Sequence, residues 1–132
     1  MSEHPNETII RRFYDAFSSG DAATLTDLST EGIVWSTPGS SRISGEHKGR
    51  DAVFAVFQLC GELTRGRMGL ELEDLEVQGD GTVVTVHRLT AERDGPGKLD
   101  IRETETWTIE DGKVARVDEA ASDLPASDSF WS

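Results

Sequence analysis

Three short turn motifs divide the second half of the chain into strand-like runs, and they constrain the fold more than any other feature. The motifs are GDG at 79–81, DGPG at 94–97 and EDGK at 110–113. Glycine beside aspartate is typical of tight hairpin turns, because these turns need backbone angles that glycine adopts without strain. The sequence therefore predicts an antiparallel meander of four strands at 68–78, 82–93, 99–110 and 114–122.

Alternation within these runs assigns side chains to faces. Residues 99–110 place Ile101, Glu103, Glu105, Trp107 and Ile109 on one face, because successive side chains of a strand point to opposite sides. The run 82–93 is apolar on both faces, which indicates an interior strand. The run 68–78 changes phase near 73–74, where we expect an irregularity.

The first half of the chain predicts three helices and one strand. The helices span 7–19, 22–29 and 50–64, and the strand spans 32–37. A long loop joins this strand to the third helix, and the tail 123–132 is expected to dock through its two aromatic residues. The residues expected to face inward from the first and third helices are Ile9, Ile10, Phe13, Phe17, Val53, Phe54, Phe57 and Cys60.

This order of elements predicts the fold class. Helices gathered on one face of a mostly antiparallel sheet form an α+β domain. A chain of 132 residues can close one hydrophobic core but not two, so we expect a single domain over 1–132. A curved sheet that wraps three N-terminal helices is cone-shaped and leaves a cavity, the kind of place where small molecules bind.

Composition excludes several classes of partner. The formal net charge of −12 argues against nucleic acid and anionic membrane surfaces, which need a surplus of Lys and Arg. No run approaches the roughly 20 apolar residues of a membrane span. The N-terminus lacks the basic start and apolar core of a signal peptide, and Cys60 is the only cysteine, so we expect a cytoplasmic protein.

The candidate chemistry lies on the predicted meander. His87 is on one strand, Glu103 and Glu105 are on the next, and Glu119 is expected to face inward from the last. Burial raises the pKa of a carboxyl and a nearby anion raises that of a histidine, so such a cluster suits general acid–base work. A structural His–Glu pair is the alternative. The histidines lack metal-ligand spacing, and no nucleophile or phosphate-loop motif occurs, so we expect neither metal nor cofactor.

Four segments together carry a resemblance to a known family. They are FYDAFSSGD at 13–21, VWSTPG at 34–39 with SGEHKGRDAV at 44–53, WTIEDGKV at 107–114, and the FW pair at 130–131. The chain resembles the SnoaL-like, ketosteroid isomerase-related group of bacterial proteins in the nuclear transport factor 2-like superfamily. The resemblance implies a cone-shaped α+β fold. It also implies a homodimer formed through the outer sheet face, which here includes Thr104, Thr106 and Thr108.

The catalytic positions of ketosteroid isomerases are not reproduced in this chain. The helix-one tyrosine position falls on Phe13, with Tyr14 beside it, and the base position before Pro38 falls on Thr37. The position of the protonated carboxyl falls on Glu105 or Glu103. Because threonine cannot act as a base, steroid isomerisation by that mechanism is not expected.

We therefore expect a small-molecule-binding protein with a cofactor-independent acid–base activity. The ligand would be a small apolar ring or polyketide-like molecule, and the reaction an isomerisation, cyclisation, dehydration or epoxide opening. The alternative is a non-catalytic ligand-binding or dimerisation domain of the same fold. The predicted site has His87, Glu105 and Glu103 as catalytic residues, the loop 38–48 at its mouth, and as ligand-binding residues Tyr14, Trp35, Thr37, Phe54, Phe57, Trp107 and Glu119.

Overall fold

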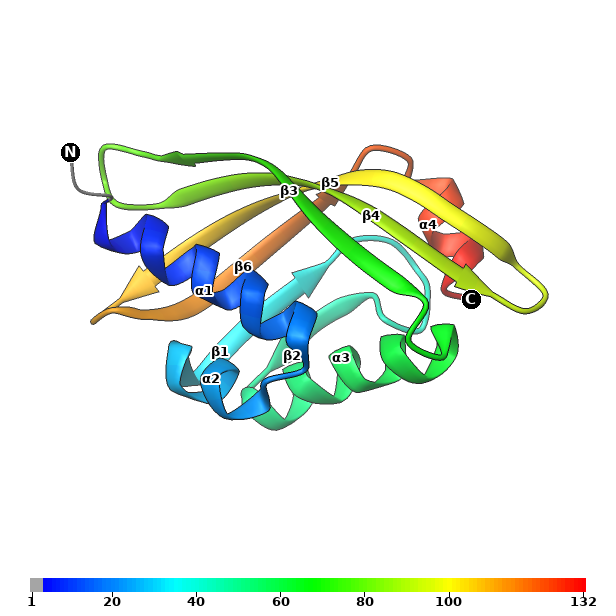
Figure 1. The fold of residues 1–132 in the computed structure, drawn as a ribbon, viewed down its shortest axis with the longest axis horizontal. Helices are drawn as coiled ribbons and strands as arrows, with labels where there is room; N and C mark the ends of the chain where they lie inside the picture. The colour runs from blue at the N-terminus through cyan, green and yellow to red at the C-terminus, as the bar shows by residue number, and fades with distance from the viewer. Residues whose placement is uncertain (1–3) are drawn as a thin grey trace.

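The computed structural model describes residues 4–132, so the first three residues of the predicted domain lie outside it. The described chain forms four helices and six strands (Figure 1). The helices are α1 (Pro5–Ser19), α2 (Ala22–Leu28), α3 (Arg50–Thr64) and α4 (Leu124–Phe130). The strands are β1 (Ser29–Thr37), β2 (Gly45–Lys48), β3 (Met68–Val77), β4 (Val83–Arg93), β5 (Gly97–Glu110) and β6 (Lys113–Ala121).

All six strands join one sheet in the order β2-β1-β6-β5-β4-β3. The predicted meander β3–β4–β5–β6 is confirmed, with every neighbouring pair antiparallel. The one parallel pair is β1 with β6. The register of β3 against β4 shifts between Leu72 and Asp74, at the irregularity that the change of phase predicted.

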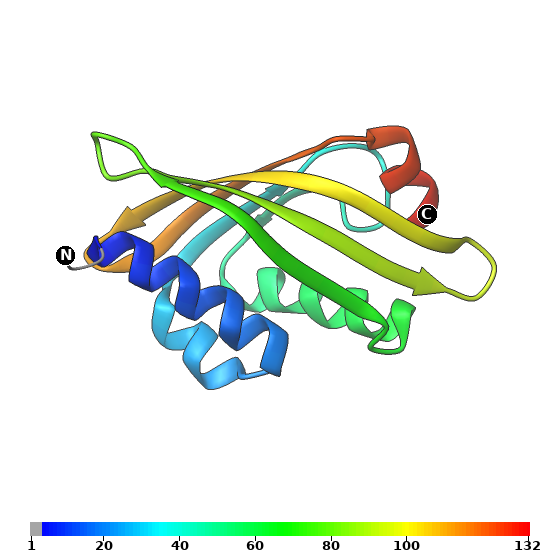
Figure 2. The ribbon, with the colours of Figure 1, turned by 45° about the horizontal axis from the view of Figure 1, so that its top comes forward.

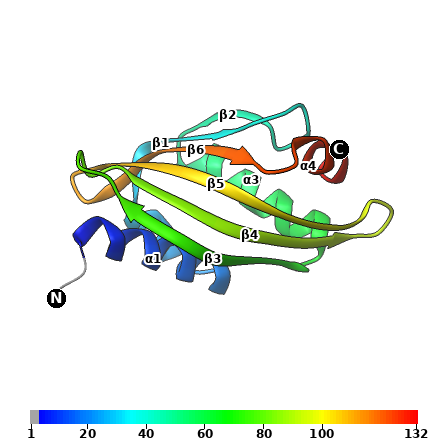
Figure 3. The ribbon, with the colours of Figure 1, turned by 90° about the horizontal axis from the view of Figure 1, so that it is seen from above.

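The helices α1, α2 and α3 lie on one face of this sheet, which curves over them (Figures 2 and 3). The α+β prediction is therefore confirmed. The third helix has the predicted bounds. The first begins two residues earlier than expected, at Pro5, because the His4 side chain accepts a hydrogen bond from the Asn6 backbone and caps the helix. No helix of the described residues is long and apolar enough to cross a membrane.

Two elements were not predicted. Residues 45–48 form β2, a short edge strand that pairs with β1 inside the expected loop. Its sequence, GEHK, has no apolar alternation, so only the pairing of its backbone makes it a strand. The tail also forms a fourth helix, α4, which Asp123 caps by accepting from the Ala126 backbone. The expected docking of the tail is confirmed, since Phe130 is 3% exposed and Trp131 is 1% exposed.

Candidate functional site

Two cross-strand pairs bring the polar residues of the inner sheet face together. His87 on β4 lies opposite Glu103 on β5, and Glu105 lies opposite Glu119 on β6. Directly opposite side chains of an antiparallel pair have Cβ atoms about 4.5–5.5 Å apart, so they interact. Alternation alone determined that these residues share a face, and the register of the strands makes them neighbours.

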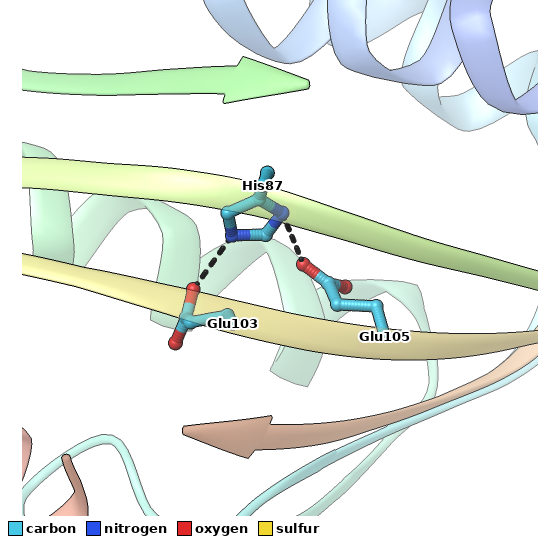
Figure 4. A group of neighbouring side chains, drawn as sticks. All are labelled: His87, Glu103 and Glu105. Carbon is cyan, nitrogen blue, oxygen red and sulfur yellow. Dashed lines mark hydrogen bonds and ion pairs between the residues drawn. The ribbon is translucent and has the colours of Figure 1, made fainter. Parts of the chain in front are cut away.

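His87 lies between the two glutamates of β5 (Figure 4). Its Nε2 is 2.8 Å from Glu103 Oε1, and its Nδ1 is 3.2 Å from Glu105 Oε1. A third partner comes from α1, where the Tyr14 hydroxyl is 2.7 Å from Nδ1. The histidine side chain is 1% exposed, so these groups replace water as its hydrogen-bonding partners.

The hydrogen bonds around Tyr14 form a chain in which only one assignment of donors and acceptors gives every proton an acceptor. Trp107 Nε1 donates to Thr85 Oγ1 at 2.9 Å, and an indole N–H can only donate. Thr85 Oγ1 contacts the Trp107 nitrogen and the Tyr14 oxygen. Of these two atoms, only the Tyr14 oxygen, at 2.9 Å, can accept the hydroxyl proton of Thr85. The Tyr14 proton is then free for His87 Nδ1. Nδ1 is therefore an acceptor, and the ring proton sits on Nε2 and is donated to Glu103.

Glu105 is the most deeply buried acidic residue of the site. It is 3% exposed, and no described residue forms a hydrogen bond with its buried Oε2. Burial, followed by repulsion from Glu119 and Glu103, raises its pKa well above the usual value of a glutamate. Burial therefore favours the protonated form of Glu105, which keeps a hydrogen-bonding oxygen that no described residue uses.

Glu119 is a second protonated carboxyl, and two residues of β1 form hydrogen bonds with it. Trp35 Nε1 and Thr37 Oγ1 both donate to its Oε1, each at 2.7 Å. Burial and the charge of Glu103 raise its pKa to about 8, although these two hydrogen bonds lower it. Since both donors engage Oε1, the proton sits on Oε2. Thr37 on β1 thus orients an acid supplied by another strand.

These groups line a hollow between the sheet and the helices, which we call the inner cavity. Its volume is about 60 Å³. All the predicted site residues except Phe54 line it, and so do all three tryptophans of the chain. The loop 38–48 contributes Ile43 to its wall. The apolar wall residues that the sequence did not assign to it are Phe13, Phe17, Ile43, Val56, Cys60, Met68, Leu70, Leu89 and Trp131.

The placement of Phe54 in this cavity was wrong. Phe54 stacks on the outer side of Phe57, with ring centroids 6.1 Å apart, and lines a separate hollow. The shared helical stripe put both rings on the inner side of α3, but only Phe57 reaches the inner cavity. Trp131 and Thr85 were also missed as parts of the site. The signals that could have found them are the aromatic tail and the two-residue spacing of Thr85 from His87.

His87, Glu103 and Glu105 also form the kind of cluster that can hold a metal ion. One ligand atom from each lies within 4.8 Å of the others, although their sequence spacing gave no such signal. A metal needs a free lone pair on the imidazole. Here Nδ1 accepts from Tyr14 and Nε2 donates to Glu103, so a metal could bind at Nδ1 only by displacing the Tyr14 hydroxyl.

Comparison with known proteins agrees with this fold. The family model for the SnoaL-like domain matches residues 10–117. The chain belongs to the SnoaL-like domain family. A curated relative of this SnoaL-like chain, an uncharacterised protein of Mycobacterium tuberculosis, is 34% identical over 99% of both chains.

Solved structures show how widely the SnoaL-like fold is shared. Bal32a, from a soil-derived mobile gene cassette, is 43% identical with a TM-score of 0.94, and the match covers 97% of each chain. A putative SnoaL-like polyketide cyclase from Jannaschia sp. CCS1 is 19% identical with a TM-score of 0.79, over 100% of this chain and 98% of that one. At that identity the likeness to the cyclase concerns the fold alone.

Proposed function

We propose that this SnoaL-like protein is a cofactor-independent acid–base enzyme acting on a small, mostly apolar organic molecule. The observation that carries the proposal is the pairing of a proton-accepting carboxylate with a buried carboxyl in one cavity. Glu103 accepts the Nε2 proton of His87, while burial raises the pKa of Glu105 beside it and favours its protonated form. Two neighbouring carboxyls in different environments are a usual arrangement of a general base and a general acid.

Each group then has a distinct role. Glu103 is the base, which takes a proton from a carbon next to a carbonyl group. Glu105 is the acid, which hydrogen-bonds the carbonyl oxygen through its otherwise unpartnered Oε2. His87 orients Glu103, and Glu119 offers a second neutral carboxyl from β6. This proton transfer is a first step common to isomerisation, cyclisation and dehydration.

The apolar wall strengthens both roles. Trp35, Phe57 and Trp107 surround the carboxyls and keep water away from them. Charge interactions are stronger where water is excluded, so a hydrogen bond to a developing negative charge stabilises it more there than in solution.

A second candidate function is non-catalytic ligand binding in the same cavity. One observation favours it: both ring nitrogens of the buried His87 already have hydrogen-bonding partners in the protein. Such a histidine can serve purely to satisfy buried polar groups.

Proton exchange with solvent distinguishes the two candidates without knowledge of the natural substrate. We would incubate the protein in D₂O with a panel of ring-containing ketones such as 2-tetralone and follow deuterium entry beside the carbonyl by NMR. An acid–base enzyme accelerates this exchange. We expect Glu103→Gln and Glu105→Gln each to slow it by about a hundredfold or more. The matched control is Glu110→Gln, which removes one carboxylate from the exposed end of β5.

Two results would contradict the enzyme proposal. One is exchange no faster than in buffer for every ketone of the panel. The other is unchanged exchange in both site variants, with only the melting temperature altered, as a structural role of these residues requires. Added EDTA should leave the rate unchanged, because the proposed steps use only side chains of the protein.

A further inference from the structure

A second hollow lies outside the inner cavity, and we call it the outer groove. It runs between the end of α1, the start of α2, helix α3 and the first residues of β3. Its volume is about 730 Å³, more than ten times that of the inner cavity. Its apolar lining residues are Phe17, Leu25, Phe54, Phe57, Met68 and Leu70, with Ala22 at the start of α2.

The two hollows share a wall. Phe17, Phe57, Met68 and Leu70 line both of them. Phe17 and Phe57 meet edge to face, with ring centroids 5.0 Å apart, and both rings are only partly buried. This aromatic pair, which we call the partition, forms part of the wall between the inner cavity and the groove, together with Met68 and Leu70.

The inner cavity alone is too small for the ligand that its walls suit. Its 60 Å³ holds only a few water molecules, each of which needs at least about 10–15 Å³. An apolar cavity that takes up benzene is about 150 Å³. A ligand whose reactive atoms reach Glu105 must therefore extend beyond the inner cavity.

The composition of the outer groove indicates what extends into it. None of the described residues that line it is charged, although 29% of the residues of the chain are. Gly61 lies in the middle of this surface on α3, where glycine is less favourable than alanine by about 1 kcal/mol. A Cβ built at Gly61 would meet no atom within 4 Å, so packing does not require glycine there. What glycine provides is room in the groove.

We propose that the outer groove binds the apolar extension of the ligand whose polar head occupies the inner cavity. The partition opens by rotation of Phe17 and Phe57, and the ligand lies across it. The ligand class is therefore a neutral, elongated molecule with an oxygen-bearing head and an apolar tail. This inference rests on the proposed ligand-binding role of the inner cavity, but not on the catalytic roles of its residues.

A series of 4-alkylphenols, from phenol to 4-hexylphenol, tests this at concentrations where each is monomeric. Binding is followed by calorimetry and by tryptophan fluorescence, since Trp35, Trp107 and Trp131 all line the inner cavity. In the wild type we expect affinity to rise roughly three- to fourfold for each added methylene that enters the groove. Gly61→Phe fills the groove, so it should bind 4-hexylphenol at least tenfold more weakly than the wild type, and the loss of affinity should grow with the length of the alkyl chain.

Two further variants make the result specific. Gln58→Trp fills the same groove from the preceding turn of α3, and it replaces Gly61→Phe if that variant fails to fold. Glu62→Phe adds the same bulk on the exposed side of the helix, outside the groove, and should keep the gain per methylene. Wild-type affinity for 4-hexylphenol in both groove variants would overturn the proposal, as would affinity that does not grow with chain length.

The proposed groove and the proposed catalytic activity can be tested independently of each other. His87→Ala removes a partner of both glutamates and leaves the groove intact, so the gain per methylene should persist in it. A protein that shows this gain but no ketone exchange has the two-part binding site without the enzyme activity.

Discussion

At the scale of single residues, Trp107 acts on the site through a chain of hydrogen bonds. Its indole N–H can only donate, so Thr85 accepts from it and passes its own proton to Tyr14. Burial raises the pKa of Tyr14, so the phenol keeps its proton and donates to His87. This chain of hydrogen bonds, rather than the histidine alone, keeps the ring proton on the side of Glu103.

Replacing Thr85 with valine tests that chain. Thr85→Val removes the acceptor of the Trp107 N–H and the donor to Tyr14, so the fully buried indole loses its partner. We expect the free energy of unfolding to fall by about 1–3 kcal/mol. We also expect the ¹⁵N shifts of the His87 imidazole to report a changed proton distribution between its nitrogens. Thr85→Ser restores the hydroxyl and should restore those shifts, whereas an unchanged imidazole spectrum in Thr85→Val would contradict the assigned direction.

The buried carboxyls predict how stability depends on pH. The pKa of Glu119 is about 8 in the folded protein against 4.5 for an ordinary glutamate, and that of Glu105 is also raised. Between these values the unfolded chain releases protons that the folded protein retains. The free energy of unfolding should therefore fall with rising pH, by about 1.4 kcal/mol per unit for each such group.

The corresponding measurement compares melting temperatures between pH 5 and pH 8.5. The wild type should melt at a lower temperature at pH 8.5, and Glu119→Gln should reduce this difference because glutamine does not titrate. Glu110→Gln, at the exposed end of β5, should not reduce it. A Glu119→Gln profile parallel to that of the wild type would show that Glu119 is not protonated in the folded protein.

At the scale of elements, helix α4 and the loop after β1 hold each other at one end of the cavity. Asp128 of α4 accepts a hydrogen bond from the Ser40 backbone at 3.0 Å, and the Arg42 backbone donates to Trp131 O at 3.4 Å. Gly39 allows this approach, because a Cβ there would be 2.0 Å from Asp128 Oδ1. Through these contacts Trp131 becomes a wall of the inner cavity.

Gly39→Ala is the sharpest test of this contact. The backbone at Gly39 has a φ of +95°, which alanine adopts only with strain, and the new methyl group would collide with Asp128. We expect a loss of about 1–3 kcal/mol in stability and a red-shifted tryptophan emission as Trp131 becomes exposed. Gly79→Ala is the matched control, since its φ is not positive and its Cβ would meet nothing within 4 Å. Equal melting temperatures for the two variants would rule out the contact.

At the scale of the whole molecule, the outer face of the sheet is suited to self-association. Thr104 and Thr106 lie opposite Val86 and Val84, which gives an uncharged patch of β-branched side chains that extends to Thr108. Arginine–carboxylate pairs border this patch, among them Arg102 with Glu73 and Arg116 with Asp118. A two-fold interface places such a patch against its own copy, so uncharged residues meet at the centre.

We expect the protein to be a homodimer joined through this patch. Light scattering coupled to size-exclusion chromatography should give twice the mass of 14.4 kDa, and Thr106→Arg should give the monomer mass because it puts a bulky charged side chain at the centre of the uncharged patch. Lys98→Glu, on the β4–β5 hairpin away from the patch, is the control. A wild-type monomer at high micromolar concentration would contradict this expectation.

The sequence by itself determined which residues face inward. Alternation along a strand is a local property, so the shared face of Glu103, Glu105 and Trp107 follows from their spacing alone. Hairpin motifs determined which strands are neighbours in the meander, because tight turns join adjacent antiparallel strands. The helix over 50–64 likewise follows from the period of its apolar residues.

The tertiary structure decided what these residues contact. Thr37 and Glu119 are 82 positions apart and meet only because β1 lies parallel to β6, a pairing that no turn motif specifies. Tyr14 reaches His87 because α1 packs across β4, and Phe54 is kept from the inner cavity by the packing of α3. Contacts of this kind depend on how separate elements pack in three dimensions, and local periodicity carries no record of that packing.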